Sequence, residues 1–519
     1  MSFLKNKFLQ HIINIFIISF FAIYFNTISG NNGILAPDSF SFLDGSAQIL
    51  NDKLPIRDYW LMNGVLIHYL QSIFFYFFGI NWKTYVFHAS FFNLVFGIFS
   101  YYFFIKFELR KLFSLIYSIS IVILFYPTAG TPIVYFHSSI LCLIALFLTY
   151  LSLRNKNNHI FFVPLFMLAA YLSGIVPSVY INLVILIILI YLIKSNKKII
   201  TTFIIGSFFS ILLLAIFFIT TETSLTDFLY QQILIPFSIG QARYASSPEA
   251  FAQINSITLN KVLDFYYIYI FLIPLILILF KRKNDDKNNL INVSYIFTVF
   301  LFIFAQLTSN NQTFIHFLIP ISAFFLHKEI INIHKKKFIY LIFLIVFIFT
   351  IKFGYRNIIE RRFNDFQWTN MSYYTESSIV NIDLNNLKWI SPKNFSLVEN
   401  SNDEINLLND LAINLNKDNS NFSIFTNYQI FSILLNRDYE LLQTAWFKNA
   451  THPNPESKYY NYYKLFINKL IAKKKIDKIL FLEINSNEYK NFIEKICSTD
   501  FIEINNYKIT IFDFTKCKK

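Results

Sequence analysis

The sequence predicts a multi-pass α-helical membrane protein of about eleven transmembrane helices, followed by a C-terminal soluble α/β domain on the extracytoplasmic side. Hydrophobic residues make up 55% of the 519 residues, 64 residues are Phe and only 15% are charged. No class of soluble globular protein has this balance. Long apolar stretches also alternate with short basic clusters, and this alternation stops near residue 354.

The first apolar stretch, Phe8 to Ile28, is about as long as a bilayer crossing requires. It follows the basic residues Lys5 and Lys7, and the Asn31-Asn32-Gly33 segment after it does not resemble a signal-peptide cleavage site. We therefore expect a retained helix whose N-terminus lies on the cytoplasmic side.

Lysine and arginine gather in clusters between the apolar stretches. The formal net charge of +14 is compatible with nucleic-acid binding, but no basic face with interleaved aromatic residues accompanies it. We therefore expect no nucleic-acid partner. Short cationic loops are retained on the cytoplasmic side of a membrane. The clusters that mark such loops are Arg110-Lys111, Arg154/Lys156, Lys194/Lys197/Lys198, Lys281-Arg282-Lys283/Lys287 and Lys328/Lys335/Lys336/Lys337.

Consecutive cytoplasmic clusters must be separated by an even number of crossings, and this parity orders the spans. Gly174 and Pro177 mark a turn that divides Ile160 to Ile193 into two short helices. With the N-terminus inside, the C-terminus then lies outside. The other expected spans are Thr84 to Ile105, Leu112 to Tyr126, Ser138 to Leu153, Ile199 to Ile219, Phe265 to Phe280, Val293 to Leu307, roughly Asn311 to Leu326, and Phe338 to Ile351.

One apolar stretch does not fit this order as a crossing. Val65 to Phe78 carries His68 and Gln71, and counting it as a span would place Arg110-Lys111 outside. We expect residues 65–80 to form an interfacial or re-entrant helix on the outer face.

The composition changes after residue 353 to Asn, Lys, Asp and Glu with short apolar runs. We therefore divide the chain into a transmembrane domain, residues 1–353, and a soluble domain, residues 354–519. Cys497 and Cys517 could pair in an oxidising compartment. The expected elements, which alternate as in a small α/β domain, are a helix over Glu404 to Asn414, a strand over Phe422 to Thr426, a helix over Tyr459 to Lys474, and strands over Lys478 to Glu483 and Tyr507 to Phe514.

The first outside loop, residues 30–64, holds a group of acidic residues close to the membrane: Asp38, Asp44, Asp52 and Asp58. Carboxylates there are costly to desolvate, so the group is a candidate site. The alternative is that they are solvated acids and helix caps, with Asp38 capping a helix over Ser39 to Leu50.

The loop and the segment after it resemble the GT-C class of polyprenyl-phosphate-sugar-dependent glycosyltransferases, which includes protein mannosyltransferases and lipid A aminoarabinose transferases. An Asp directly after the first span, Asp38, is followed by Phe42, Ala47 and Leu50. The loop continues as Leu-Pro-Ile-Arg-Asp-Tyr-Trp over residues 54–60 and Asn-Gly-Val-Leu over 63–66, and leads into Phe-Phe-Gly at 77–79. The similarity extends in order and topology to about His327, with Asn-Asn-Gln at 310–312 and His-Phe-Leu-Ile-Pro at 316–320.

The resemblance implies that Asp38 is the base of an inverting displacement, in which a carboxylate takes the proton of an acceptor hydroxyl. Asp58 matches the second loop acid of the family, with a salt bridge to Arg57 as the alternative. Asp44 is a further substrate-binding candidate, with a solvated helix face as the alternative. Many members carry a second acid directly after the loop Asp, but Ser39 stands here.

The implied donor is a sugar on a polyprenyl phosphate, whose leaving phosphate needs nearby cations. Tyr59 could hold the lipid or stack on a sugar, or could belong to the aromatic belt of a membrane protein. No metal-ligand spacing stands out, although a divalent metal is possible, and the loop over Pro127 to His137 lacks the acid that some members carry there. The other phosphate-binding candidates, each of which could instead be an interface anchor, are Arg57, His137, Arg243, Lys261 and His316.

These features predict an enzyme of the inner membrane that transfers a sugar from a polyprenyl-phosphate carrier to a lipid, polysaccharide or protein acceptor. Two alternatives stay open: a polymerase or ligase of surface polysaccharide, and a transporter of lipids or solutes. The spans contain few ionisable residues and show no repeat, which argues against transport.

Overall fold

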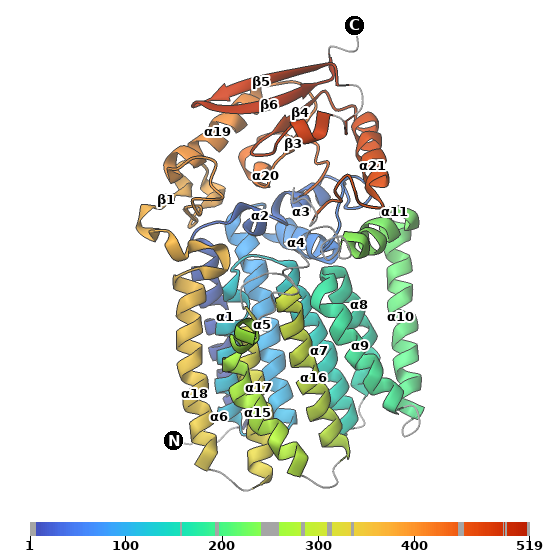
Figure 1. The fold of residues 1–519 in the computed structure, drawn as a ribbon, viewed down its shortest axis with the longest axis vertical. Helices are drawn as coiled ribbons and strands as arrows, with labels where there is room; N and C mark the ends of the chain where they lie inside the picture. The colour runs from blue at the N-terminus through green and yellow to red at the C-terminus, as the bar shows by residue number, and fades with distance from the viewer. Residues whose placement is uncertain are drawn as a thin grey trace.

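A computed structural model describes residues 7–155, 158–192, 197–239, 259–281, 286–308, 314–333, 337–444, 451–490, 492–493 and 496–515. A bundle of long helices forms one end of the molecule and a small sheet with flanking helices forms the other (Figure 1). Short helices lie between these two parts.

Each apolar stretch that was predicted to cross the membrane contains a helix. Among the described residues, seven helices are long and apolar enough to cross: Phe8–Asn31, Trp82–Lys106, Lys111–Thr128, Val134–Arg154, Lys197–Thr221, Lys287–Leu307 and Lys337–Ile359. The chain is therefore a helical membrane protein. The bundle helices are α1 (Lys7–Asn31), α5 (Trp82–Lys106), α6 (Lys111–Leu124), α7 (Val134–Asn155), α8 (Val163–Ser173), α9 (Ile175–Leu192), α10 (Lys197–Thr221), α15 (Tyr266–Lys281), α16 (Asp286–Thr308), α17 (Leu318–Asn332) and α18 (Lys337–Gly354).

The break between α8 and α9 confirms the predicted turn at Gly174. Its carbonyl accepts a hydrogen bond from Ser138 Oγ on α7 at 2.8 Å. A Cβ at Gly174 would lie 3.0 Å from the Val134 carbonyl oxygen, so the absence of a side chain lets this turn approach α7 closely.

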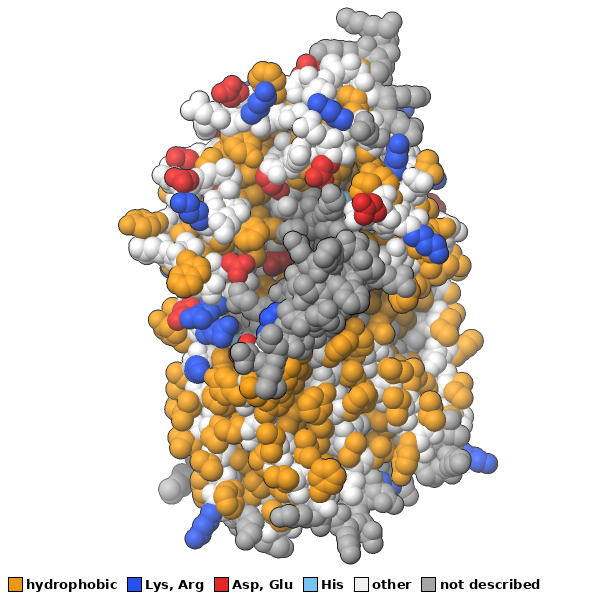
Figure 2. Space-filling view, in the orientation of Figure 1, with side chains coloured by type: hydrophobic (Ala, Val, Ile, Leu, Met, Phe, Trp, Pro, Cys, Tyr) orange, Lys and Arg blue, Asp and Glu red, His pale blue; other side chains and the backbone are white. Residues whose placement is uncertain are grey.

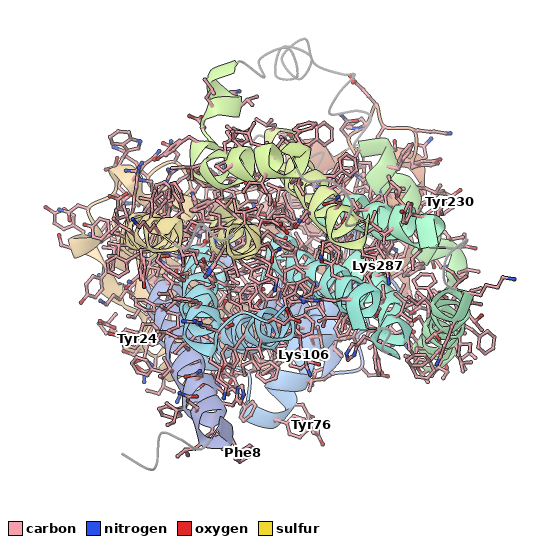
Figure 3. The ribbon with its side chains drawn as sticks, turned by 90° about the horizontal axis from the view of Figure 1, so that it is seen from below. Phe8, Tyr24, Tyr76, Lys106, Tyr230 and Lys287 are labelled. Atoms are coloured by element: carbon pink, nitrogen blue, oxygen red, sulfur yellow. The ribbon has the colours of Figure 1, made fainter. Side chains whose placement is uncertain are left out.

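Many large hydrophobic side chains of the long helices are exposed on the surface of the bundle. Figure 2 shows hydrophobic side chains covering the bundle, with charged side chains above and below them. Viewed along the bundle, Phe8, Tyr24 and Tyr76 lie at its rim and point outward (Figure 3). α7 is central, since its apolar segment is completely buried, whereas α10 stands at the edge with most of its side chains exposed.

Ion pairs gather residues from separate basic clusters at one end of the bundle. Glu108 Oε2 accepts Arg154 Nη2 at 2.7 Å and Lys328 Nζ at 3.2 Å. The facing ends of α9 and α10, of α15 and α16, and of α17 and α18 lie at this same lower end of the view in Figure 1. The ends of these helices that adjoin basic clusters therefore lie at one end of the bundle.

The first loop and the segments that cover it form a layer between the bundle and the sheet (Figure 1). It contains α2 (Ala36–Ser39), α3 (Leu43–Ile49), α4 (Val65–Phe78) and α11 (Leu225–Leu229). The helix predicted over Val65 to Phe78 is confirmed. The remaining short helices are α14 (Leu259–Leu263), η2 (Tyr126–Thr128), η3 (Asn158–Phe162), η4 (Tyr230–Leu234), η5 (Ile315–Phe317), η6 (Tyr355–Ile359), η7 (Arg362–Asn364), η8 (Phe366–Trp368), η9 (Met371–Tyr373), η10 (Ser377–Ile379) and η11 (Ile382–Leu384).

A mixed four-stranded sheet, ordered β3-β4-β6-β5, lies farthest from the bundle. The β3–β4 pair is parallel and the other pairs are antiparallel. The helices and strands predicted from the sequence here are confirmed to within a few residues. The elements are β1 (Thr375–Glu376), β2 (Lys388–Trp389), α19 (Ser401–Lys417), β3 (Phe422–Phe425), α20 (Phe431–Leu434), α21 (Tyr460–Lys473), β4 (Lys478–Phe481), α22 (Asn487–Lys490), β5 (Ser498–Ile504) and β6 (Tyr507–Asp513).

Cys497, directly before β5, is disulfide-bonded. Its predicted partner Cys517 lies outside the described residues, and Cys142 is a buried free thiol in α7.

Candidate functional site

The first loop leaves α1 and pairs at once with a segment more than 350 residues later in the chain. Gly33 N donates to the Lys388 carbonyl at 3.1 Å and Ile34 N donates to the Ile390 carbonyl at 2.9 Å. Because these bonds fix the backbone just before α2, the C-terminal part of the chain sets the position of the acidic loop.

Arg361, in the segment after α18, anchors three parts of the chain around the start of this loop. Its side chain is buried and donates to the carbonyls of Asn32 at 3.0 Å and Ala129 at 3.0 Å, and to Ser29 Oγ. Burial lowers the pKa of this guanidinium to about 9. A planar guanidinium can bond several carbonyls at once, which explains why an Arg holds this junction.

Asp38 lies within the short helix α2, and the prediction that it caps a helix over Ser39 to Leu50 is wrong. α2 begins at Ala36, before Asp38, with Pro37 in its first turn, and a second helix, α3, begins at Leu43. The Ser39 hydroxyl accepts a hydrogen bond from Leu35 N at 2.9 Å at the start of α2. The Asp38 carboxylate is thereby left without a capping role.

The Asp38 carboxylate is half-buried and lies within the electrostatic reach of a second acid, Asp365. Burial, and then the charge of Asp365, raise the pKa of Asp38 to about 6. No residue in the described part of the chain forms a hydrogen bond or salt bridge with this carboxylate. Phe366 packs against Gly33, and this contact brings the loop of Asp365 onto the start of the first loop.

Basic side chains from the C-terminal part of α18 and the turn after it form a group that was not among the residues predicted from the sequence. Lys352 Nζ donates to Tyr266 Oη at 2.7 Å, and Arg362 Nε pairs with Glu360 Oε2 at 2.5 Å. Arg356 is half-buried, lies within the electrostatic reach of Arg362, and makes no hydrogen bond or salt bridge with another described residue. We call Lys352, Arg356 and Arg362 the basic group.

The basic group has a signal in the sequence. Four basic residues fall within residues 352–362, directly after the last apolar stretch, on the side that parity places outside. Figure 2 shows Lys and Arg side chains at this upper border of the apolar surface.

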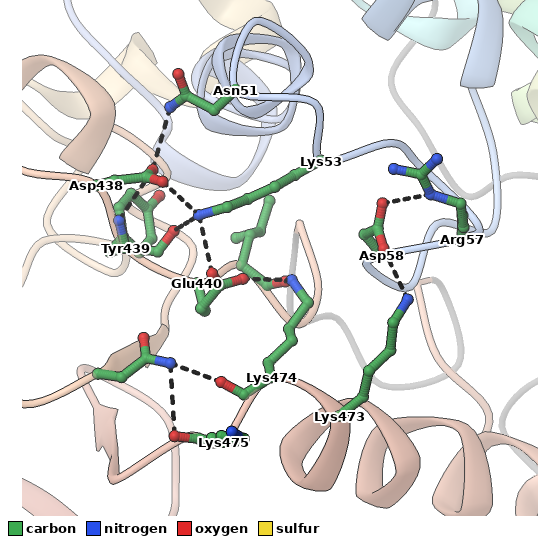
Figure 4. Close-up of polar contacts among 12 residues, drawn as sticks. Asn51, Lys53, Arg57, Asp58, Asp438, Tyr439, Glu440, Lys473, Lys474 and Lys475 are labelled. Carbon is green, nitrogen blue, oxygen red and sulfur yellow. Dashed lines mark hydrogen bonds and ion pairs between the residues drawn. The ribbon is translucent and has the colours of Figure 1, made fainter.

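Asp58 is held by ion pairs and a backbone bond (Figure 4). Its carboxylate accepts Arg57 Nε at 2.6 Å, Leu54 N at 3.0 Å and Lys473 Nζ at 3.2 Å. Burial opposes ionisation, but these bonds outweigh it and lower the pKa of Asp58. The salt bridge with Arg57 that was the alternative for Asp58 is therefore present, and Arg57 also donates to the Thr221 carbonyl at 3.2 Å.

Lys53 forms a second set of salt bridges between the first loop and the C-terminal part (Figure 4). Its Nζ pairs with Asp438 at 2.7 Å and with Glu440 at 3.0 Å, and Glu440 also pairs with Lys474 at 2.6 Å. The far end of the loop is thus fixed by charge pairs.

Asp44 and Tyr59 are buried in the same loop and bond to the protein itself. The Asp44 carboxylate accepts Phe431 N at 3.0 Å, Ser432 N at 2.8 Å and Tyr439 Oη at 2.7 Å. Burial raises its pKa to about 6, although these bonds favour the charged form. The Tyr59 hydroxyl donates to the Gly45 carbonyl at 2.9 Å.

The remaining predicted residues lie in different places. His137 is buried, with Nε2 3.1 Å from Nε2 of His88, and its Nδ1 contacts the Tyr126 hydroxyl. His316 is buried 3.2 Å from Asn357 Nδ2 and within the electrostatic reach of Arg356, so it lies beside the basic group. Lys261 is exposed on α14, and Arg243 falls outside the described residues.

Within the described ranges, no group of three or more His, Cys, Asp or Glu residues could hold a metal ion.

No protein-family model and no curated protein matches this chain.

Proposed function

We propose that the protein is a membrane glycosyltransferase that moves one sugar from a polyprenyl-phosphate carrier to a lipid, polysaccharide or protein acceptor. The observation that carries the proposal is Asp38, a half-buried carboxylate with a pKa of about 6 and no bonding partner among the described residues. A general base works best when its pKa lies near the working pH. An acid with a purely structural role would be bonded, as Asp44 and Asp58 are.

In the proposed reaction, Asp38 takes the proton of an acceptor hydroxyl as its oxygen forms a bond to the anomeric carbon of the sugar. The bond from that carbon to the phosphate oxygen breaks, and the phosphate leaves with the electron pair. Attack opposite the leaving group inverts the configuration of the sugar. The polyprenyl phosphate is then released as the product.

The basic group supports the second half of this reaction. Charge-assisted bonds from Lys and Arg stabilise the negative charge that builds up on a leaving phosphate. The guanidinium of Arg356 makes no hydrogen bond or salt bridge with another described residue, so it can bind a phosphate. Arg362, in the same group, is three residues from Asp365, the acid whose charge acts on Asp38. The basic group directly follows the last apolar stretch of the chain, at the depth where a lipid phosphate would lie.

The proposed orientation follows from the basic clusters, with the N-terminus inside and the site outside. Together with the seven long helices, we include α17 and the shorter apolar helices His159–Ser173, Ile175–Tyr191 and Tyr266–Phe280, which makes about eleven spans. The disulfide at Cys497 supports an oxidising, extracytoplasmic compartment for the C-terminal part.

The test is transfer of radiolabelled sugar from lipid carrier in membranes that contain Asp38→Asn. Loss of a general base is expected to slow transfer by about 10²- to 10⁴-fold, with unchanged membrane expression. Asp52→Asn is the matched control because Asp52 is an acid of the same loop with a side chain that is 91% exposed. Normal turnover by Asp38→Asn would overturn the proposal.

A further inference from the structure

A pocket lined by aromatic side chains lies beside α21, in the C-terminal part of the chain. Its volume is about 160 Å³. Phe492 stands among three tyrosines, with ring centroids 5.1 Å from Tyr463, 5.8 Å from Tyr460 and 5.7 Å from Tyr489. The polar lining consists of His452, Asn454 and Glu488.

The size and lining of the pocket suit one sugar ring. A cavity of about 150 Å³ holds a benzene ring, so this pocket takes the ring of one sugar when the hydroxyl groups extend to its open side. The C–H bonds on one face of a sugar carry partial positive charge and pack against the negative face of an aromatic ring. Hydroxyls at the ring edge need planar hydrogen-bonding groups, which Asn454 and Glu488 supply.

The charges around the pocket do not favour a cationic ligand. A site for an organic cation combines aromatic faces with uncompensated negative charge. Here the acids Glu456 and Glu488 are accompanied by Lys458 and Lys490 in the same short segments. A neutral ring with hydroxyl groups is therefore the better fit.

One wall of the pocket is packed directly on the first loop. Tyr463 lies edge-to-face with Trp60, with centroids 4.6 Å apart. Trp60 N donates to the Leu442 carbonyl at 2.8 Å, and Trp60 Nε1 donates to the Thr451 carbonyl at 2.9 Å, next to His452. The pocket and the loop that carries Asp38 are thus parts of one packed unit.

We propose that this pocket binds one sugar ring of a glycan acceptor, away from the end that reacts. The assignment of the sugar to an acceptor rests on the proposed function, whereas the binding of a sugar ring rests on the pocket alone. The acceptor would then bind at two places, the pocket and the site of Asp38. The enzyme would select its acceptor partly by a sugar ring that takes no part in the reaction.

Binding can be measured without any transfer reaction. The full chain is placed in lipid nanodiscs free of glycoside detergent, and saturation-transfer NMR is recorded with methyl glycosides of glucose, galactose, mannose and N-acetylglucosamine. Tetramethylammonium is the comparison probe. We expect saturation of at least one glycoside and none of tetramethylammonium. Saturation of tetramethylammonium alone, or of no probe, would overturn the proposal.

Variants locate the signal in the pocket. Tyr460→Ala and Glu488→Gln are expected to weaken glycoside binding by roughly two- to tenfold, the size of one aromatic or polar contact. Tyr460→Phe keeps the aromatic face and should retain most of the binding. Tyr373→Ala and Glu503→Gln are the matched controls, since both residues are exposed and lie outside the lining. Equal binding by all the variants would place the sugar elsewhere and refute the pocket site.

The two proposals fail separately. Absence of glycoside binding in a protein that transfers sugar would refute the pocket alone. Glycoside binding in a protein that transfers no sugar from the carrier lipid would refute the proposed function and leave a sugar-binding pocket.

Discussion

Asp38 and Asp365 form a pair of acids in which one raises the pKa of the other. The ordinary pKa of Asp38 is 3.8 and its value in the folded protein is about 6. Between these values the folded state binds more protons than the unfolded state, so the contribution of Asp38 to stability falls as the pH rises through this window. Activity follows the opposite course, because catalysis needs the ionised carboxylate.

The proposed mechanism therefore predicts that kcat/KM rises with pH and levels off above a midpoint near 6. Asp365→Asn removes the neighbouring charge, so the midpoint should move to lower pH while activity at neutral pH persists. The pKa of Asp44 is also about 6, but Asp365 does not contribute to it. A shift of the midpoint in Asp365→Asn would therefore point to Asp38. A midpoint that stays in place in Asp365→Asn would show that another group controls the profile.

Arg361 and Arg362 are adjacent in sequence but are predicted to have different roles. Arg361→Met would leave buried carbonyls without donors and is expected to cost about 3 kcal/mol or more in the free energy of unfolding. Arg362→Met loses a partly exposed ion pair and should cost about 1 kcal/mol or less. Thermal unfolding in nanodiscs measures both values.

Measurements of transfer activity test the role of Arg362. Arg362→Met is expected to slow transfer through loss of phosphate binding in a fully folded protein. Equal stability and activity of Arg362→Met and the wild type would remove Arg362 from the phosphate site.

At the residue scale, the sequence could single out Asp38 as a candidate but could not predict its surroundings. Its position after the first apolar stretch is visible in the chain, whereas Asp365 lies more than 300 residues later and nothing in the sequence relates the two. The pairing of Arg57 with Asp58 was foreseeable because the residues are adjacent. The partners of Asp44, which lie at 431–439, were not.

Among the elements, the short extended segment before α2 depends on a glycine. Gly33 has φ +72°, and a Cβ there would lie 2.6 Å from the Phe366 ring. Gly33→Ala is expected to destabilise the protein by about 2–4 kcal/mol, from backbone strain together with the steric clash. It should also lower transfer activity, because Phe366 adjoins the loop of Asp365.

Gly79→Ala is the matched control. Gly79 has φ +83°, but a Cβ there would be 3.4 Å from Asn81 Nδ2, an ordinary contact. At φ +83° and ψ 158° its backbone is itself strained by a side chain, so Gly79→Ala is also expected to destabilise the protein. Gly79 does not contact Phe366, so transfer by the folded fraction should stay normal. Equal losses of transfer in the two variants would indicate that the contact with Phe366 contributes nothing.

The helices were predictable as elements because their signal is local. Apolar length and the positions of Gly174 and Pro177 are properties of short segments. The division of residues 36–49 into two helices was missed, because the first helix begins at Ala36 and the second at Leu43 within a segment that reads as one. The pairing of residues 33–34 with 388–390 is non-local and has no sequence signature.

For the whole molecule, the orientation is the testable feature. In a background without native cysteines, Glu399→Cys should react with a membrane-impermeant maleimide on intact cells. Lys197→Cys should react only after the membrane is permeabilised, since it belongs to a cluster predicted to face the cytoplasm. Both positions are exposed, so accessibility within the protein does not separate them. Labelling of Lys197→Cys on intact cells would reverse the proposed topology.

The ties between the first loop and residues 388–440 also have a consequence for biosynthesis. The loop emerges from the ribosome near the start of translation, but the groups that hold Gly33, Asp44 and Lys53 are synthesised after every membrane helix. Chains fold from the N-terminus as they are made. The acidic loop therefore cannot reach its final structure until the last part of the chain has been synthesised. A chain that ends at residue 353 would insert its helices into the membrane but would lack the site.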